Sequence, residues 1–289
     1  IFHSGTNIKS EDSFLLNSPP IQTKLLNNYK KLRKCCEKNR ITVSQITKTL
    51  KKFRKLTSLV IGDLIVDQFI SCDPIGLSSE APVVVVKEQK SNDYIGGAGI
   101  VSAHISALGA NSKFISVVGL DDVGKRAKQM LSLRDVSNKL FKDSTRPTTY
   151  KTRYMVDAQK IFRVSRLAEH NISSEIESKV IEHLKRTCST VNQIIVSDFV
   201  YGVITPGILS TILELKEKYK FKIYGDLQCS SQIGSVLRFK GFDFIFPTEK
   251  EARIAVSNKD DGIEQVANKV INYTNIRGLI IKLGGEGLI

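Results

Sequence analysis

The sequence predicts an α/β fold in which a mainly parallel sheet is flanked by helices and carries a small β lid. From Thr57 onward, short apolar runs rich in β-branched residues alternate with segments of helical period, and this alternation is typical of βαβ units. In two places strand follows strand with no helix between them, which a parallel core does not allow. The expected strands are 59–61, 83–87, 113–118, 150–155, 160–164, 193–197, 221–225, 242–246 and 278–283.

Several helices have starts that can be read from the sequence. Ser174-x-x-Glu177 has the form of a capping box, and Thr205-Pro206 supplies an N-cap followed by proline at the first helical position. Asp261 or Gly262 is expected to begin a further helix. These starts place helices between the expected strands, as a parallel sheet requires.

The two stretches without a helix are expected to form the lid. One joins Val83–Val86 to Asp93–Ile95, and the other joins Thr148–Tyr154 to Lys160–Val164. A lid over the ligand end of the sheet would exclude water from a bound ligand.

The positive charge is concentrated near the N-terminus. The formal net charge is +14, but residues 24–55 contain twelve Lys and Arg residues against the single Glu37. We therefore predict a basic extension or linker over residues 1–56 and a nearly neutral domain over 57–289. Within the extension, an amphipathic helix is expected, with Ser44 as N-cap. Docking of this helix on the domain, or its contact with an anionic membrane or RNA, remain open alternatives.

Composition favours an ordinary globular domain in a reducing compartment. No apolar run approaches the roughly 18 residues of a membrane span, and no signal peptide is recognisable. The five cysteines are odd in number and lack C-x-x-C spacing, so we expect free thiols and a cytoplasmic location. The four histidines are scattered and predict no metal cluster.

Two segments have the pattern of a small-molecule site. Gly96-Gly97 opens a helix, where glycine lets backbone N–H groups approach a ligand closely, and Gly119 to Gly124 forms a second glycine-bounded loop. Upstream, Gly62-Asp63 breaks an apolar run, and Asp67 is expected in the loop beyond that strand. Ligands of open α/β sheets bind at this end of the strands, and a carboxylate there can accept hydrogen bonds from two hydroxyl groups. An ordinary strand-to-helix turn and a surface aspartate are the alternative interpretations.

The lid sequence adds three cations. Strand alternation places Lys151 and Arg153 on one face, and Arg163 follows in the next strand. Cations that converge on one cleft suit an anionic substrate, whereas a solvated strand face is the alternative.

Taken together, Tyr94–Gly124 resembles the sugar-binding signature of the PfkB (ribokinase-like) carbohydrate kinases, and the resemblance covers roughly residues 57–289. It implies a ribokinase-like fold and ATP-dependent phosphorylation of a sugar, with Asp67, Gly96 and Gly97 as sugar-binding residues. The lid sequence and Val196–Phe199, which includes Asp198, are similar to the heptose 7-phosphate kinases. This resemblance implies a phosphorylated sugar bound also by Asp198 and the lid cations.

The C-terminal part resembles the nucleotide side of the same family. Lys282–Gly287 is similar to its nucleotide-binding turn, which implies that Lys282, Gly284, Gly287 and Asp226 contact ATP. Pro247–Glu251 resembles its N-x-x-E motif, which implies that Glu251 lies near Mg²⁺. The sequence departs from the family pattern at several positions: Ile100, Tyr201, Gln228, Thr248 and Lys282. These departures leave a catalytically inactive sugar-binding or sensor module as the alternative.

The catalytic aspartate of the family belongs to a G-A-G-D motif, which is not found in these 289 residues. The resemblance implies that this general base lies beyond Ile289, so we expect this chain to bind a sugar phosphate without turning it over. Some relatives carry a nucleotidyltransferase domain ahead of the kinase domain. The tail of such a domain is one interpretation of Ser4–Ile8, and a disordered polar leader is the other. The expected binding partners are a sugar or sugar phosphate and a nucleotide. A homodimer through the lid is left open. Binding of nucleic acid is the least favoured of these expectations.

Overall fold

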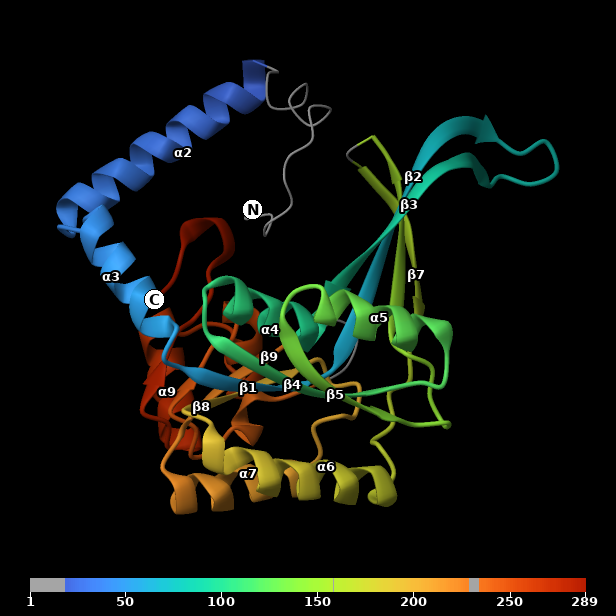
Figure 1. The fold of residues 1–289 in the computed structure, drawn as a ribbon. Coiled ribbons are helices and arrows are strands. Elements are labelled where there is room, and N and C mark those ends of the chain that lie inside the picture. The colour runs from blue at the N-terminus through green and yellow to red at the C-terminus, as the bar shows by residue number, and fades with distance from the viewer. Residues whose placement is uncertain (1–18, 158, 229–233) are drawn as a thin grey trace.

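The computed structural model describes residues 19–157, 159–228 and 234–289. They form a parallel sheet of seven strands in the order β11-β10-β9-β8-β1-β4-β5 and a separate sheet of four strands in the order β3-β2-β6-β7 (Figure 1). The predicted α/β class, with a mainly parallel sheet flanked by helices, is confirmed. The parallel strands are β1 (Thr57–Gly62), β4 (Asn111–Val118), β5 (Val136–Lys142), β8 (Gln193–Asp198), β9 (Lys222–Leu227), β10 (Phe244–Ile245) and β11 (Gly278–Leu279).

Helices cover both faces of the parallel sheet. In Figure 1, α4 and α5 lie on one face of the sheet and α6 and α7 on the other. The helices that pack with the sheet are α4 (Gly97–Ala107), α5 (Asp122–Ser132), α6 (Ser174–Thr187), α7 (Pro206–Tyr219), α8 (Glu249–Ala255) and α9 (Ile263–Thr274).

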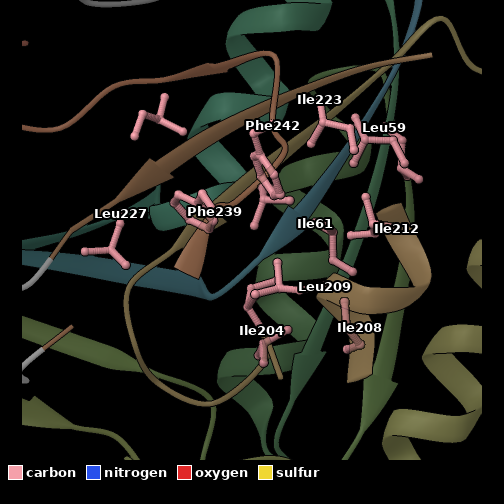
Figure 2. Close-up of a cluster of buried hydrophobic side chains, with 14 of the residues drawn as sticks. Leu59, Ile61, Ile204, Ile208, Leu209, Ile212, Ile223, Leu227, Phe239 and Phe242 are labelled. Atoms are coloured by element: carbon pink, nitrogen blue, oxygen red, sulfur yellow. The ribbon is translucent and has the colours of Figure 1, made fainter. Parts of the chain in front are cut away.

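The sheet separates two hydrophobic cores. Leu59 and Ile61 pack with α6 and α7, whereas Val60 between them packs with α4 and α5, and all three side chains are fully buried. Burial on both faces explains why β1 is a continuous apolar run rather than an alternating one. The larger core also holds Ile212 of α7 and Phe239 from the loop before β10 (Figure 2).

The four-stranded sheet is the lid. It consists of β2 (Leu64–Leu77), β3 (Val84–Gly96), β6 (Tyr150–Val156) and β7 (Gln159–Arg166). Hairpin β6–β7 is antiparallel, as predicted. Val83–Val86 and Asp93–Ile95 are not two strands, because Val84–Val86 and Asp93–Ile95 belong to one long strand, β3. The partner of β3 is β2, a strand that the sequence did not suggest. It begins two residues after β1 ends, so the lid is joined directly to the parallel sheet.

Several boundaries differ from the predictions. Asp67 lies within β2 rather than in a loop. Helix α6 is capped by Ser173, whose hydroxyl accepts the N–H of Ile176. The predicted capping box is not formed, because the N3 residue after this cap is Ile176, and Glu177 bonds the Thr205 hydroxyl. Strand β5 was not predicted, and β10 and β11 are shorter than expected. The Thr205 cap of α7 and the Gly262 start of α9 are confirmed.

Two helices precede β1, namely α2 (Pro19–Lys38) and α3 (Val43–Phe53), and both lead away from the sheets in Figure 1. The N-cap of α3 is Thr42, in a capping box with Gln45, and not Ser44. Within the described residues, no helix is long and apolar enough to cross a bilayer. The cysteines described, Cys35, Cys36, Cys72 and Cys188, are free thiols. The segment Ser4–Ile8 and Cys229 lie outside the described residues.

Candidate active site

Polar side chains gather where neighbouring parallel strands end. Asp63 follows β1, Asp198 ends β8, and Asp226 lies near the end of β9, while Lys282 follows β11. Because these strands are parallel neighbours, or nearly so, their carboxyl ends meet at one edge of the sheet. Strand β2 rises from the same edge, and so brings the lid over it.

Asp67 lies at the base of the lid and contacts two of the residues predicted with it. Its carboxylate forms an ion pair with the Arg153 guanidinium, and both side chains are largely buried. Gly96 lies so close to the Asp67 carboxylate that a Cβ atom would overlap it. Gly97 has a φ of 58°, and its backbone lies against the carbonyl of Asp63. The structure therefore brings Asp67, Gly96 and Arg153 together.

Lys151 is the most buried of the lid cations, with 5% of its surface exposed. It is the register partner of Asp67 in the parallel pair β2–β6. Its ammonium group donates to the Tyr201 hydroxyl at 2.9 Å and lies 5.0 Å from the centre of the Tyr201 ring and 5.9 Å from that of Phe199. The aromatic faces help to hold a cation that is nearly out of water.

The predicted common face of the lid is confirmed by the strand register. Arg153 pairs with Arg163 across β6–β7 and with Phe69 across β2–β6, so all three side chains lie on one face together with that of Lys151. The Arg153 guanidinium lies 5.1 Å from the centre of the Phe69 ring. Arg163 is exposed, so this face has a buried cation near the sheet and more accessible ones further out.

Asp63 organises the loop that follows β8. The carboxylate is buried and accepts the backbone N–H groups of Phe199 at 2.7 Å, Val203 at 3.3 Å and Tyr201 at 3.4 Å. Within this loop Val200 has a φ of 62°, which is strained for a β-branched residue. Burial raises the pKa of Asp63 to about 7, with a further contribution from the charge of Asp198, against the opposing effect of the three N–H groups.

Asp198 is buried beneath the lid and is already bonded. It accepts from Arg238 at 2.6 Å and from the N–H of Val200 at 2.8 Å, and burial raises its pKa although Arg238 opposes this. Arg238 also donates to the carbonyl of Ile204 at 2.6 Å, and the buried Arg146 donates to that of Tyr201 at 2.8 Å. These charged side chains thus hold the loop that follows β8 at several points. A contact between Asp198 and substrate stays a prediction.

The predicted nucleotide residues lie at the other end of the sheet edge. The Lys282 ammonium bonds the Asp226 carboxylate at 2.6 Å. Gly284 and Gly287 have φ values of 62° and 109°, and a Cβ atom at either position would meet no other atom within 4 Å. The glycine turn is therefore open, with backbone groups that a ligand can approach.

Glu251, the residue predicted near the metal, caps helix α8. Its carboxylate accepts the N–H of Thr248 at 2.8 Å, and its own N–H donates to the Thr248 hydroxyl at 3.3 Å. Thr248 forms a bridge to Lys282, which places Glu251 near the glycine turn. In the part of the chain that the structure describes, no three His, Cys, Asp or Glu side chains gather into a metal site.

The sequence reasoning missed Asp63, Arg146 and Arg238. Asp63 directly follows an apolar strand, the same signal that selected Asp67, but it was interpreted only as a strand end. Arg238 lies 40 residues from Asp198, so no local pattern connects the two. These residues hold the loop that presents Tyr201 to Lys151.

Comparison with known proteins gives the same family. The family model described as "pfkB family carbohydrate kinase" matches residues 55–289. The "bifunctional protein HldE" of Geotalea uraniireducens is 29% identical over 248 residues, which are 84% of this chain and 50% of that protein. The protein of the same name from Campylobacter curvus is 32% identical over 244 residues, 81% of this chain and 50% of its own length. The chain thus spans about half the length of these relatives.

Solved structures agree on the fold. Phosphofructokinase-2 from Escherichia coli, in complex with fructose-6-phosphate, has a TM-score of 0.62 at 14% identity and matches 81% of this chain and 75% of its own. Ribokinase from Arabidopsis thaliana, complexed with ribose and ATP, has a TM-score of 0.59 at 14% identity and matches 81% of this chain and 73% of its own. The lid, the sheet edge and the match over residues 55–289 lead to one conclusion: the chain belongs to the pfkB family of carbohydrate kinases.

Proposed function

We propose that this chain provides the sugar-phosphate site of a kinase that transfers a phosphoryl group from ATP to a heptose phosphate or a similar anionic sugar. The proposal rests on the common lid face, where Lys151 and Arg153 lie beside Asp67 and Arg163 lies across from Arg153. In this assignment Asp67 and the N–H groups at Gly96 and Gly97 bind sugar hydroxyls, and the cations bind the phosphate that the sugar already carries.

The residues at the sheet edge are compatible with a nucleotide. An open glycine turn beside a cation is suited to phosphate, and Lys282 next to Gly284 provides that combination. The Asp226 carboxylate would keep Lys282 oriented. Bound ATP would supply the phosphoryl group, and the chain would contribute by positioning the sugar and excluding water with the lid.

The residues at this edge of the sheet give less support for bound Mg²⁺ than for a bound nucleotide. Glu251 is the residue that we assign near the metal, because it caps the helix that begins after Thr248, and Thr248 is bridged to Lys282 beside the glycine turn. Magnesium commonly keeps several waters and is bound through one or two carboxylates plus substrate phosphates, so a single carboxylate near the glycine turn is compatible with it.

The test compares each sugar phosphate with its dephosphorylated form by titration calorimetry on the 289-residue chain. Asp67→Asn should weaken both ligands at least tenfold, whereas Lys151→Met should weaken only the phosphorylated one, by about 10- to 100-fold, as expected for a lost charged hydrogen bond. Asp73→Asn, in the exposed outer part of β2, is the matched control and should change neither. Equal losses of both ligands in Lys151→Met would refute the phosphate assignment.

A sugar-binding module without phosphoryl transfer is the second candidate. The bond between Lys151 and Tyr201 favours it, because Tyr201 stands where the family resemblance implies a further lysine. Both candidates predict that this chain binds a sugar phosphate without producing ADP, because the G-A-G-D motif to which the resemblance assigns the general base is not found in these 289 residues. ADP formation that depends on the sugar phosphate would show that the base has been misassigned. The proposed homodimer through the lid would use edge strands β3 and β7, and sedimentation velocity would detect it.

A further inference from the structure

The N-terminal helices take no part in the proposed kinase site. Here "the basic arm" denotes residues 29–55, which include the end of α2 and all of α3. Residues 43–53 are all described, and none of them is buried. In Figure 1 the arm leads away from both sheets, so α3 is not docked on the domain as one of the alternatives required. Its surface is left for another function.

Helix α3 carries an exposed apolar stripe. Val43, Ile46 and Leu50 follow one another at intervals of three and four residues, which places them on one face of a helix. Their side chains are 81%, 47% and 39% exposed. Solvent-exposed branched side chains at regular helical spacing form a continuous strip, unlike single exposed apolar residues, and such a strip indicates contact with something apolar.

The arm also carries many cations, most of them away from this stripe. Lys48 and Lys52 lie on the face of α3 opposite the stripe, Lys51 lies on its flank, and Lys55 follows the end of the helix. The end of α2 adds Lys30, Lys31, Arg33, Lys34 and Lys38. The acidic residue of this segment, Glu37, forms an ion pair with Arg33 at 2.9 Å and offsets little of the positive charge of the arm. The arm therefore presents an apolar strip and a strong positive charge together.

We propose that the basic arm binds the surface of an anionic lipid bilayer. Helix α3 would lie in the plane of the interface, with Ile46 and Leu50 among the acyl chains near the headgroups and the lysines against anionic headgroups. A nucleic acid would satisfy the cations but would leave the apolar stripe in water. An interface binds both features, and it needs no helix long enough to span the membrane.

The first experiment is vesicle flotation of the 289-residue chain. Vesicles contain either phosphatidylcholine alone or phosphatidylcholine with one-fifth phosphatidylglycerol. The chain should float with the anionic vesicles and not with the neutral ones, and added salt should reduce binding. Absence of binding to anionic vesicles, or equal binding to both kinds, would overturn the proposal. Binding to heparin or RNA without vesicle binding would overturn it in favour of a polyanion site.

A second experiment tests whether the apolar stripe of α3 inserts into the bilayer, separately from the electrostatic attraction of the arm to anionic lipids. The sequence contains no tryptophan, so Leu50→Trp introduces a single fluorophore on the stripe. On anionic vesicles its emission should shift to shorter wavelength and should be quenched by brominated acyl chains. An unchanged spectrum despite binding would refute insertion and leave only surface electrostatics.

Two substitutions with the same change in charge complete the design. Leu50→Asp removes an apolar anchor, and Ser44→Asp places the same charge about 120° around the helix. The first should lower vesicle affinity at least tenfold and the second by no more than about fivefold, the effect of one charge near the surface. Equal losses would contradict a role for the stripe. Both variants should retain wild-type circular dichroism, because neither position is buried.

Discussion

Replacement of Asp63 by asparagine should change how the stability of the chain depends on pH. The carboxylate is buried and lies near Asp198, and its pKa is raised from 3.8 to about 7. Since the folded state holds this proton more tightly than the unfolded state, the stabilisation is fully present below about pH 4. It is lost as the pH rises towards 7, because only the unfolded chain then releases the proton freely.

The magnitude follows from the size of the shift. A rise from 3.8 to about 7 corresponds to at most about 4 kcal/mol, at 1.36 kcal/mol for each pKa unit. Asparagine has the same shape but no proton to release. At pH 4, where the folded wild type is protonated, the two proteins should agree within about 1 kcal/mol. Between pH 4 and 7 the wild type should lose up to about 4 kcal/mol relative to Asp63→Asn, a large share of the stability of a typical domain.

Urea unfolding followed by circular dichroism, at half-unit intervals from pH 4 to 8, measures the difference. Exposed Asp260 offers a matched control, because Asp260→Asn removes the same kind of group from the surface. Subtraction of the variant curve from the wild-type curve cancels every other titrating group that the substitution leaves unaltered. Parallel curves would refute the reasoning. They would mean that the three N–H groups of the loop keep Asp63 ionised despite its burial.

Further substitutions test the packing and the helix ends, each by thermal or urea unfolding. Lys220 ends α7 with a φ of 58°, so Lys220→Gly should stabilise the chain by about 1 kcal/mol, whereas Lys218→Gly within the same helix should destabilise it by about as much. Ile212 is fully buried in the larger core, and Ile212→Ala should cost about 2–5 kcal/mol. Thr205→Ala removes the N-cap of α7 and should cost about 1–2 kcal/mol; no change would show that the bond to Ile208 is not a significant cap.

The sequence was most informative where a single local pattern determines the structure. The apolar run Leu59–Ile61 indicated a strand, and the structure has strand β1 there. Strand alternation placed Lys151 and Arg153 on one side of the lid. Caps with proline or glycine at a defined position, such as Thr205-Pro206, were also located correctly. In these cases the chemistry of a few neighbouring residues is sufficient.

The failures occurred where tertiary contacts override local preference. Gly62-Asp63 looks like the end of a strand, yet the chain continues two residues later into β2, which pairs with β3 along its length and tolerates two register shifts, one of them between Pro74 and Gly76. Strand β5 lies at the edge of the sheet, where its mixed burial gives no clear periodicity. The helix expected to start at Ser174 is capped one residue earlier, by Ser173, and Glu177 bonds Thr205, which is distant in sequence.

Asp63 shows why the site could be predicted only in part. Its backbone N–H donates to Ser197 at the end of β8, and its carbonyl accepts the N–H of Ala98 in the first turn of α4. Its carboxylate holds the loop that carries Tyr201, and Tyr201 in turn holds Lys151 of the lid. One residue thus connects the parallel sheet, the glycine turn and the face of the lid that carries Lys151. Each of these contacts spans more than 30 residues of sequence, so the role of Asp63 emerges only when the strands are assembled.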